Sequence, residues 1–252
     1  MLQGKRVVVT GGGRDFGRAL SVWLAREGAE VALCSRTLAQ AQSTVDLIHA
    51  EGGKAKAYQC DITDMQAVQQ FAQSLAIDNH VIDILILSAA QWLEGDFAQG
   101  EKDEDIISTI NSGLTGSILL TKALLPYMNR EQGSDIIGMV SVCGIPHFTR
   151  SIAHPVFFAA KQGMGGFLNT ISEKLASENI RVTALYPPDF DTIDPSEEPP
   201  HQPSSGQSLL NGHAIWQTIK FVVSQPRGCH ISAIYFQGPD RETVARLEQS
   251  GR

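Results

Sequence analysis

The chain alternates short strand-like runs with amphipathic segments of helical length, and this alternation constrains its fold more than any other feature. The predicted strands are 6–10, 30–36, 54–62, 82–88, 135–142, 181–187 and 231–236, and the predicted helices are 15–28, 37–53, 64–76, 103–128, 155–178 and 213–224. Strands joined through helices of this length require right-handed crossovers and form a parallel sheet. The pattern therefore predicts one α/β domain over residues 1–252, built on a doubly wound parallel sheet.

Composition and charge exclude several classes of protein. Hydrophobic residues make up 42% of the chain and charged residues 19%, as in globular proteins with a substantial core. A net charge of -7 argues against binding to nucleic acid or to an anionic membrane surface. No apolar run approaches the ~20 residues that span a bilayer, and the N-terminus enters a strand without a signal peptide. We therefore expect a cytoplasmic protein.

The cysteines and histidines show no metal-binding pattern. Cys34, Cys60, Cys143 and Cys229 are scattered and form no CxxC pair, and the histidines lack the HExxH spacing. We therefore expect reduced thiols and no metal site.

A glycine-rich segment, VVVTGGGRDFGRAL at 7–20, joins the first predicted strand to the first helix. At such a turn, glycines let the backbone approach a pyrophosphate, and the helix N-terminus offers N–H groups and the positive end of its dipole. This segment and those described below resemble the short-chain dehydrogenase/reductase family over essentially the whole chain, which implies a Rossmann-like fold. The family writes T-G-x-x-x-G-x-G here; Thr10, Gly11 and Gly17 match, whereas Asp15 replaces the middle glycine.

Asp15 brings a side chain and a carboxylate to the place where a cofactor diphosphate would lie. At ~4–5 Å and an effective dielectric constant of ~20, like charges repel by a few kcal/mol, which predicts weakened cofactor binding. The alternative is that Asp15 turns outward or caps the helix, while Gly12 and Gly13 reshape the turn. The residues expected in this part of the cofactor site are Thr10, Gly11, Gly13, Arg14 and Gly17.

Two arginines favour NADP(H) over NAD(H). The second predicted strand ends without a carboxylate that would hold a ribose 2′-hydroxyl, whereas Arg36, with Arg14, can meet a 2′-phosphate. The alternative is that both arginines are solvated surface residues. The resemblance also implies that Asp61 and Ile62 flank the adenine.

Two further cofactor segments depart from the family pattern. Ala89 belongs to a strand end that the family writes N-N-A-G and that here lacks both asparagines and the glycine. Thr192 matches the threonine of P-G-x-x-x-T, but Pro188 replaces the glycine and removes an N–H donor.

The catalytic group implied by the resemblance is incomplete. In the family, a tyrosine transfers the proton, a lysine assists it and holds the ribose, a serine polarises the carbonyl, and an asparagine supports a water relay. Asn111, Ser141 and Lys161 match, but Phe157 occupies the tyrosine position and cannot transfer a proton. Ordinary family chemistry is therefore disfavoured. The alternative is that the surviving polar residues only satisfy buried backbone groups.

His154 is a candidate for the missing acid or base. It lies seven residues before Lys161, the spacing at which the enoyl-reductase branch of the superfamily places its tyrosine, and Pro155 predicts that it caps the helix. His147 is a second candidate. The alternative is that either histidine is a surface loop residue.

Two functions follow from these observations. The first is an NADP(H)-dependent oxidoreductase for a small carbonyl or alcohol substrate, with an impaired or non-standard site. The second is a catalytically silent subunit of a hetero-oligomer with an active family member. Beside these two stands a third hypothesis, a sensor or regulator that binds NADP(H) without turnover. The resemblance implies that helices around 101–130 and 155–178 pack against a second protomer, as in a homodimer or homotetramer. The Pro-, Ser- and acid-rich segment 187–208 is predicted to be a mobile loop on the substrate side.

Overall fold

Seven parallel strands form the central sheet, in the order β3-β2-β1-β4-β5-β6-β9. The computed structural model describes residues 2–78, 81–98, 102–192, 194–196 and 210–238. The strands of the sheet are β1 Arg6–Thr10, β2 Glu30–Ser35, β3 Lys54–Gln59, β4 Ile84–Leu87, β5 Ser134–Met139, β6 Ile180–Tyr186 and β9 Ala233–Tyr235. The chain winds outward from β1 in both directions, which confirms the doubly wound, Rossmann-like single domain expected from the sequence.

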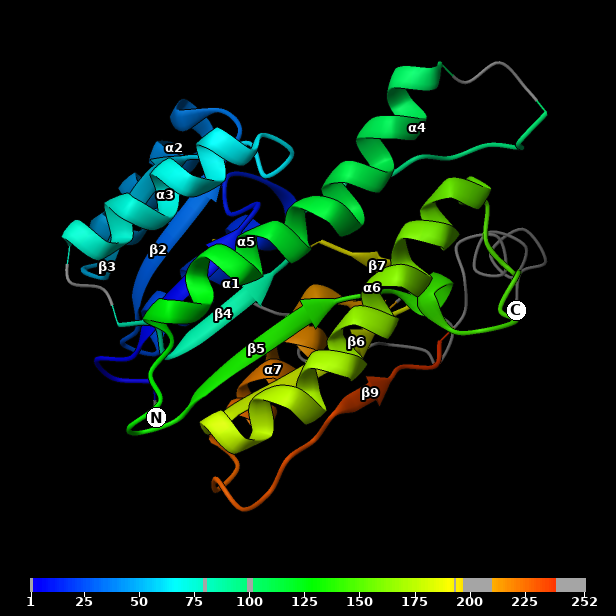
Figure 1. Ribbon diagram of the computed structural model, residues 1–252. Coiled ribbons are helices and arrows are strands. Elements are labelled where there is room, and N and C mark those ends of the chain that lie inside the picture. Colours follow the sequence, from blue (N-terminus) through cyan, green and yellow to red (C-terminus); the bar gives the residue numbers. More distant parts are fainter. Residues whose placement is uncertain (1, 79–80, 99–101, 193, 197–209, 239–252) are drawn as a thin grey trace, which may run out of the picture.

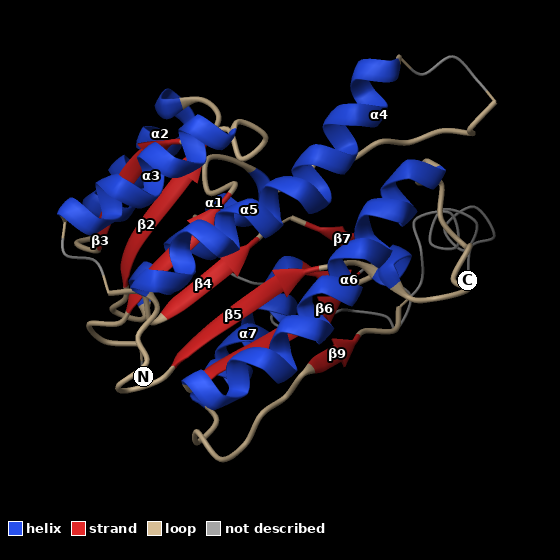
Figure 2. Cartoon of the chain, in the orientation of Figure 1, coloured by secondary structure: helices blue, strands red, loops and turns tan. Residues whose placement is uncertain are grey.

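Helices cover both faces of the sheet (Figures 1 and 2). Their bounds are α1 Asp15–Arg26, α2 Leu38–Ala50, α3 Met65–Ile77, α4 Asp103–Ile110, α5 Gly116–Leu124, α6 Pro155–Leu175 and α7 Gly212–Ser224. One core cluster joins α1, α2 and α7 to the sheet through side chains such as Trp23, Ile48 and Trp216. The other joins α3, α5 and α6 through Phe71, Leu120 and Leu168. Among the described residues, every helix is either too short or too polar to cross a membrane.

The helix predicted at 103–128 is not one regular helix. A π-helical turn, Asn111–Thr115, separates α4 from α5, and a 3₁₀ turn, Leu125–Tyr127, follows α5. A side chain at Gly116 would place its Cβ 2.4 Å from the carbonyl oxygen of Ile62, so the helix passes very close to the loop after β3. The π-helical turn, which is wider than an α-helical turn, lies directly before this close approach at Gly116.

The segment 187–208 also differs from the expected loop where it is described. Phe190–Asp191 form the short strand β7, which pairs in parallel with β8, Leu210–Asn211, just before α7. Residues 193 and 197–208 of that segment lie outside the described part of the chain. The ring of Phe190 packs edge-on against Phe16, with 5.2 Å between centroids, so β7 is fixed to the start of α1.

Candidate active site

The turn between β1 and α1 can be made only by glycines at two positions. Gly11 has φ +71°, in the region that other residues rarely adopt. A Cβ on Gly17 would lie 2.3 Å from the carbonyl oxygen of Gly11. The first turn of α1 therefore approaches the end of β1 closely, beside the crevice where such sheets bind ligands.

Asp15 has a backbone conformation that glycine adopts more readily than other residues. Its φ is +48°, and no side-chain hydrogen bond caps α1 among the described residues, so Asp15 is not a capping residue. The Asp15 side chain is 73% exposed, and its carboxylate lies 3.5 Å from Nε of Arg14. Asp15 thus turns largely outward, as the alternative interpretation held, with its charge partly offset by a neighbouring guanidinium.

Thr10 has a structural task at the end of β1. Its Oγ1 accepts hydrogen bonds from the backbone N–H groups of Ser88, at 2.9 Å, and Ala89, at 3.0 Å. The hydroxyl therefore holds the segment after β4 against the glycine turn. The departure from N-N-A-G at 87–90 leaves this link intact.

A cavity of about 360 Å³, which we call the glycine-loop cavity, opens at the carboxyl ends of β1, β2 and β4. Arg36 enters it from the end of β2, and Ile62, which is buried, forms part of its wall. Oδ1 of Asp61 accepts hydrogen bonds from N and Oγ1 of Thr63, which fixes the turn after β3. The predicted cofactor residues that line this cavity are Gly11, Arg14, Gly17, Arg36, Asp61, Ile62 and Ala89.

A second cavity, of about 390 Å³, contains the predicted catalytic residues Ser141 and Lys161; we call it the lysine cavity. Phe16 and Ser88 border both cavities, so the two adjoin. Ser141 has φ +107°, and its Oγ accepts a hydrogen bond from N of Cys143 at 3.3 Å. An oxygen that accepts from the backbone keeps its own proton available for a ligand.

Lys161 is buried on α6, with 6% of the residue exposed. Its Nζ donates to the carbonyl oxygen of Met139 at 2.9 Å and lies 5.4 Å from the centre of the Phe157 ring. Burial lowers the pKa of Lys161 to about 8, against a smaller opposing effect of Cys143. The amine therefore changes its charge within reach of neutral pH.

Phe157 faces the lysine cavity as an apolar wall, together with residues that sequence reasoning missed. Trp92 packs edge-on against Phe157, with 4.8 Å between ring centroids. Phe16, in the first turn of α1, and Asp189, after β6, also border this cavity. Trp92 lies in a segment without a motif, and Asp189 occupies a variable position of P-G-x-x-x-T, so no sequence signal identified either residue.

Five predicted site residues do not line these two cavities: Thr10, Gly13, Asn111, His154 and Thr192. Gly13 packs against Ser35 and Gln40 instead. His154 is fully buried at the N-cap of α6, as Pro155 predicted, where its Nδ1 accepts from N of Val156. The His154 side chain therefore caps the start of α6, and it is not among the residues that line the lysine cavity.

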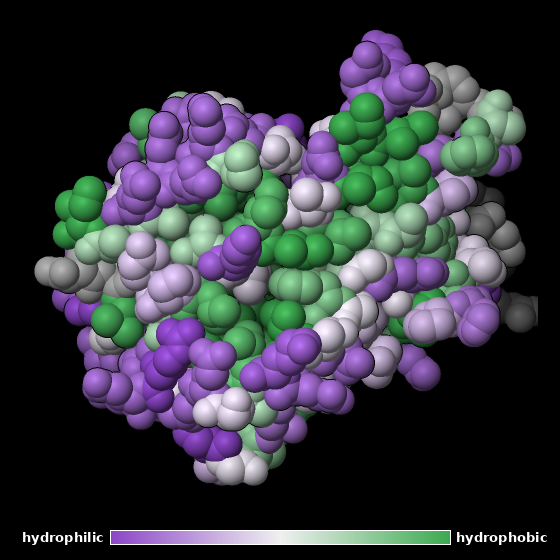
Figure 3. Space-filling view, viewed as in Figure 1, coloured by the Kyte–Doolittle hydropathy of each residue, from purple (hydrophilic) through white to green (hydrophobic). Residues whose placement is uncertain are grey.

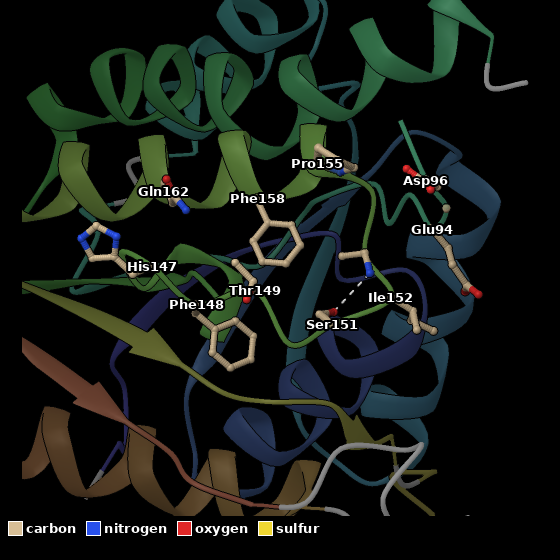
Figure 4. A pocket seen from close by; sticks show the side chains of 12 residues that line it. Glu94, Asp96, His147, Phe148, Thr149, Ser151, Ile152, Pro155, Phe158 and Gln162 are labelled. Atoms are coloured by element: carbon tan, nitrogen blue, oxygen red, sulfur yellow. Dashed lines mark hydrogen bonds between the residues drawn. The ribbon is translucent and has the colours of Figure 1, made fainter. Parts of the chain in front are cut away.

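A third and more open cavity, of about 690 Å³, lies on the outer side of the same loops; we call it the outer cavity. Figure 4 shows Phe158 projecting from α6 beside Phe148, while Glu94 and Asp96 come from the segment after β4. Glu94 and Ile152 border both this cavity and the lysine cavity. His147, which has φ +64°, is part of its wall.

A glycine turn at a helix N-terminus, in the crevice beside the first strand of a doubly wound sheet, defines the nucleotide-binding class of α/β proteins. A lysine and a serine, Lys161 and Ser141, lie at the adjoining cavity. The chain belongs to the short-chain dehydrogenase family, whose model, described as short chain dehydrogenase, matches residues 5–200.

Relatives and solved structures agree with this assignment. The chain is 30% identical to a mouse 3-oxoacyl-[acyl-carrier-protein] reductase over 184 residues, 73% of this chain and 74% of that protein. It is 27% identical to a fatty acyl-CoA reductase of Acinetobacter baylyi over 188 residues, 74% of this chain but less than two thirds (63%) of that protein. A metagenomic short-chain oxidoreductase in complex with NADP has the same fold, with a TM-score of 0.77 at 23% identity, over 94% of this chain and 98% of that one.

Proposed function

We propose that this protein is an NADP(H)-dependent oxidoreductase acting on a small apolar carbonyl or alcohol compound, with weakened cofactor binding and proton transfer. The observation that carries the proposal is the adjacency of two cavities: one holds the glycine turn and two arginines, and the other holds Ser141 and Lys161. The names of the relatives, which are reductases, and the NADP complex of a structural neighbour support it.

The residues of the glycine-loop cavity fit a dinucleotide phosphate. A Cβ on Gly17 would collide with the carbonyl oxygen of Gly11, so this tight turn has no side chain at position 17. A turn of bare backbone at a helix N-terminus is what a diphosphate requires for close approach. Arg14 and Arg36 offer guanidinium groups to a 2′-phosphate, and Asp61 and Ile62 border the expected adenine side. The carboxylate of Asp15, which lines the same cavity beside the glycine turn, opposes a phosphate there.

The lysine cavity would orient a carbonyl group and supply its proton. When bound, the nicotinamide cofactor supplies or accepts the hydride. The Ser141 hydroxyl can donate to the carbonyl oxygen, and Lys161, protonated below about pH 8, can hold the proton that this oxygen finally takes. Aromatic walls from Trp92 and Phe157 exclude water and suit an apolar substrate.

Removing the Asp15 carboxylate is expected to tighten NADPH binding. Because the side chain is 73% exposed, solvent screens the repulsion, and we expect Asp15→Gly to raise the affinity about tenfold. Fluorescence titration and the shift of melting temperature with NADPH measure this effect. The same titrations on the unchanged protein test the proposed function, with a larger shift expected for NADPH than for NADH.

Asp15→Asn is the matched control, because it removes the charge but keeps a side chain at φ +48°. We expect it to recover most of the gain. If neither nucleotide shifts the melting temperature of the unchanged protein or of Asp15→Gly, the proposed function is wrong.

A second candidate function, a non-catalytic subunit or NADP(H)-binding regulator, is favoured by an apolar surface. Figure 3 shows hydrophobic side chains gathered over α4, α5 and α6. Ile107 is 58% exposed there, while Leu114, Phe167 and Ile171 are partly buried. A Cβ on Gly166 would meet nothing within 4 Å, so this face of α6 is open to close approach by another helix. We propose that a second copy, or a related subunit, packs on this face.

Phe167→Glu is expected to dissociate such an oligomer, because a carboxylate would be buried without a partner in the interface. Light scattering coupled to size-exclusion chromatography should give a dimer or tetramer for the unchanged protein and a monomer for the variant. Phe221→Glu is the control, since Phe221 is 55% exposed on α7, on the other face of the sheet. A monomeric unchanged protein, or equal effects of both variants, would contradict this assignment of the interface.

A further inference from the structure

Lys161 can present a neutral amine, which carbonyl reduction does not use. We propose that Lys161 captures small apolar aldehydes and ketones as a reversible imine inside the lysine cavity. The amine borders this cavity together with the Ser141 hydroxyl, and no cofactor is needed for the step. The inference goes beyond the proposed oxidoreductase and stands independently of it.

The contacts of Nζ suit an uncharged amine. Among the described residues, its hydrogen-bond acceptor is the carbonyl oxygen of Met139, at 2.9 Å, and the Phe157 ring offers a π face at 5.4 Å. An ammonium group has three N–H donors and no lone pair, whereas a neutral amine has two donors and a lone pair. In a site where Phe157 replaces a hydroxyl-bearing ring, the surroundings satisfy two donors and leave the lone pair for a ligand.

The lowered pKa of Lys161 also favours imine formation, because it increases the fraction of neutral amine. With a pKa lowered by burial to about 8, roughly a tenth of Lys161 is neutral at pH 7, against roughly 4 in 10,000 for an ordinary lysine. Cys143 is the titratable group that acts on the amine, and the carboxylates Glu94 and Asp189 line the same cavity. Burial raises the pKa of the Cys143 thiol and so favours its uncharged form, and the effect of Cys143 on the pKa of Lys161 is smaller than that of burial. Burial remains the largest effect on the lysine.

The reaction is a condensation without change of oxidation state. The Nζ lone pair forms a bond to the carbonyl carbon, and the carbonyl oxygen takes a proton from the Ser141 hydroxyl. One N–H proton of the attacking nitrogen then replaces the proton that Ser141 gave up. The resulting carbinolamine loses its oxygen as water when this oxygen takes a second proton from solvent, and the nitrogen returns its remaining N–H proton to solvent. Amine and carbonyl thus give imine and water, and hydrolysis reverses the step.

The walls of the cavity indicate which carbonyl compounds fit. Trp92 and Phe157 stand edge-on, 4.8 Å apart, and Phe16 and Phe190 border the same space of about 390 Å³. Aromatic rings prefer offset or edge-on partners at such distances. An aromatic aldehyde is therefore a suitable probe, and we choose benzaldehyde.

The test uses the full chain without nucleotide, incubated with benzaldehyde and sodium cyanoborohydride, and peptide mass spectrometry locates the benzylated lysines. At pH 7 we expect Lys161 to be labelled at least about tenfold faster than Lys54, because its larger neutral fraction outweighs its lower basicity and its burial. Lys54, whose side chain is 77% exposed, is the internal control. The rate at Lys161 should rise with pH and reach half its maximum near pH 8.

Lys161→Arg supplies the second control, since a guanidinium keeps the positive charge but forms no imine under these conditions. Labelling at position 161 should disappear while the other lysines react as before. Labelling of Lys161 no faster than that of Lys54, or a rise only above about pH 10, would overturn the proposal. Because no nucleotide is present, failure of NADPH to bind leaves this result unaffected.

Discussion

Phe157→Tyr is expected to raise the kcat/KM of NADPH-dependent carbonyl reduction by about 10²-fold or more, because a positioned general acid typically contributes 10²–10⁴-fold. The substitution adds a hydroxyl to a ring that already borders the lysine cavity and lies 5.4 Å from Nζ of Lys161. The lysine cavity, of about 390 Å³, leaves room for the added hydroxyl oxygen. Steady-state oxidation of NADPH with benzaldehyde and small aromatic ketones measures the gain.

Phe158→Tyr is the matched control for this experiment. Phe158 is the next residue of α6, but it borders the outer cavity and not the lysine cavity (Figure 4). We expect no gain from it, and Lys161→Met added to Phe157→Tyr should remove the gain. If Phe157→Tyr binds NADPH and remains as slow as Phe158→Tyr, the remaining site residues are not arranged for reduction.

The second large effect concerns stability. Arg181→Met is expected to lower the free energy of unfolding by about 3 kcal/mol or more, because it leaves a buried carboxylate without its main partner. Arg181, at 7% exposure, bonds both oxygens of Asp135, with Nε–Oδ1 at 2.7 Å and Nη2–Oδ2 at 3.2 Å. Its Nη1 also donates to the carbonyl oxygens of Gln225, Pro226 and Cys229. Urea denaturation followed by circular dichroism measures the loss.

The exposed pair Arg130–Glu178 provides the comparison, with both side chains about 40% exposed. Arg130→Met should cost under about 1 kcal/mol, because solvent screens exposed ion pairs. Arg227, which also contacts Asp135, remains in both variants and prevents complete isolation of the carboxylate. Equal losses for Arg181→Met and Arg130→Met would show that the buried network contributes little to stability.

The sheet was predictable because its signals are local. Each strand run and each amphipathic helix can be seen within about a dozen residues, and crossover handedness then fixes the parallel arrangement. The helix at 103–128 was predicted without its π turn, because the turn lies where Gly116 meets the carbonyl of Ile62, a contact between distant segments. The short strand β7 was missed because two residues carry no periodicity.

The site was predictable only where a motif names its residues. The glycine turn, Ser141 and Lys161 lie in segments with a recognisable spacing, and the structure places them at adjoining cavities. Trp92 and Phe16 reach these cavities through packing between elements, which a linear pattern does not contain. The outward turn of Asp15 was one of two open alternatives, since sequence alone does not set the direction of a side chain at φ +48°.

The backbone conformation at Ser141 shows what it costs the fold to carry a hydroxyl at this position. Its φ of +107° and ψ of 155° belong to a conformation that glycine adopts freely and that costs other residues about 1–3 kcal/mol. The hydroxyl is therefore kept at the expense of folding. A glycine at this position would relieve the strain but would also remove the oxygen that accepts a hydrogen bond from N of Cys143.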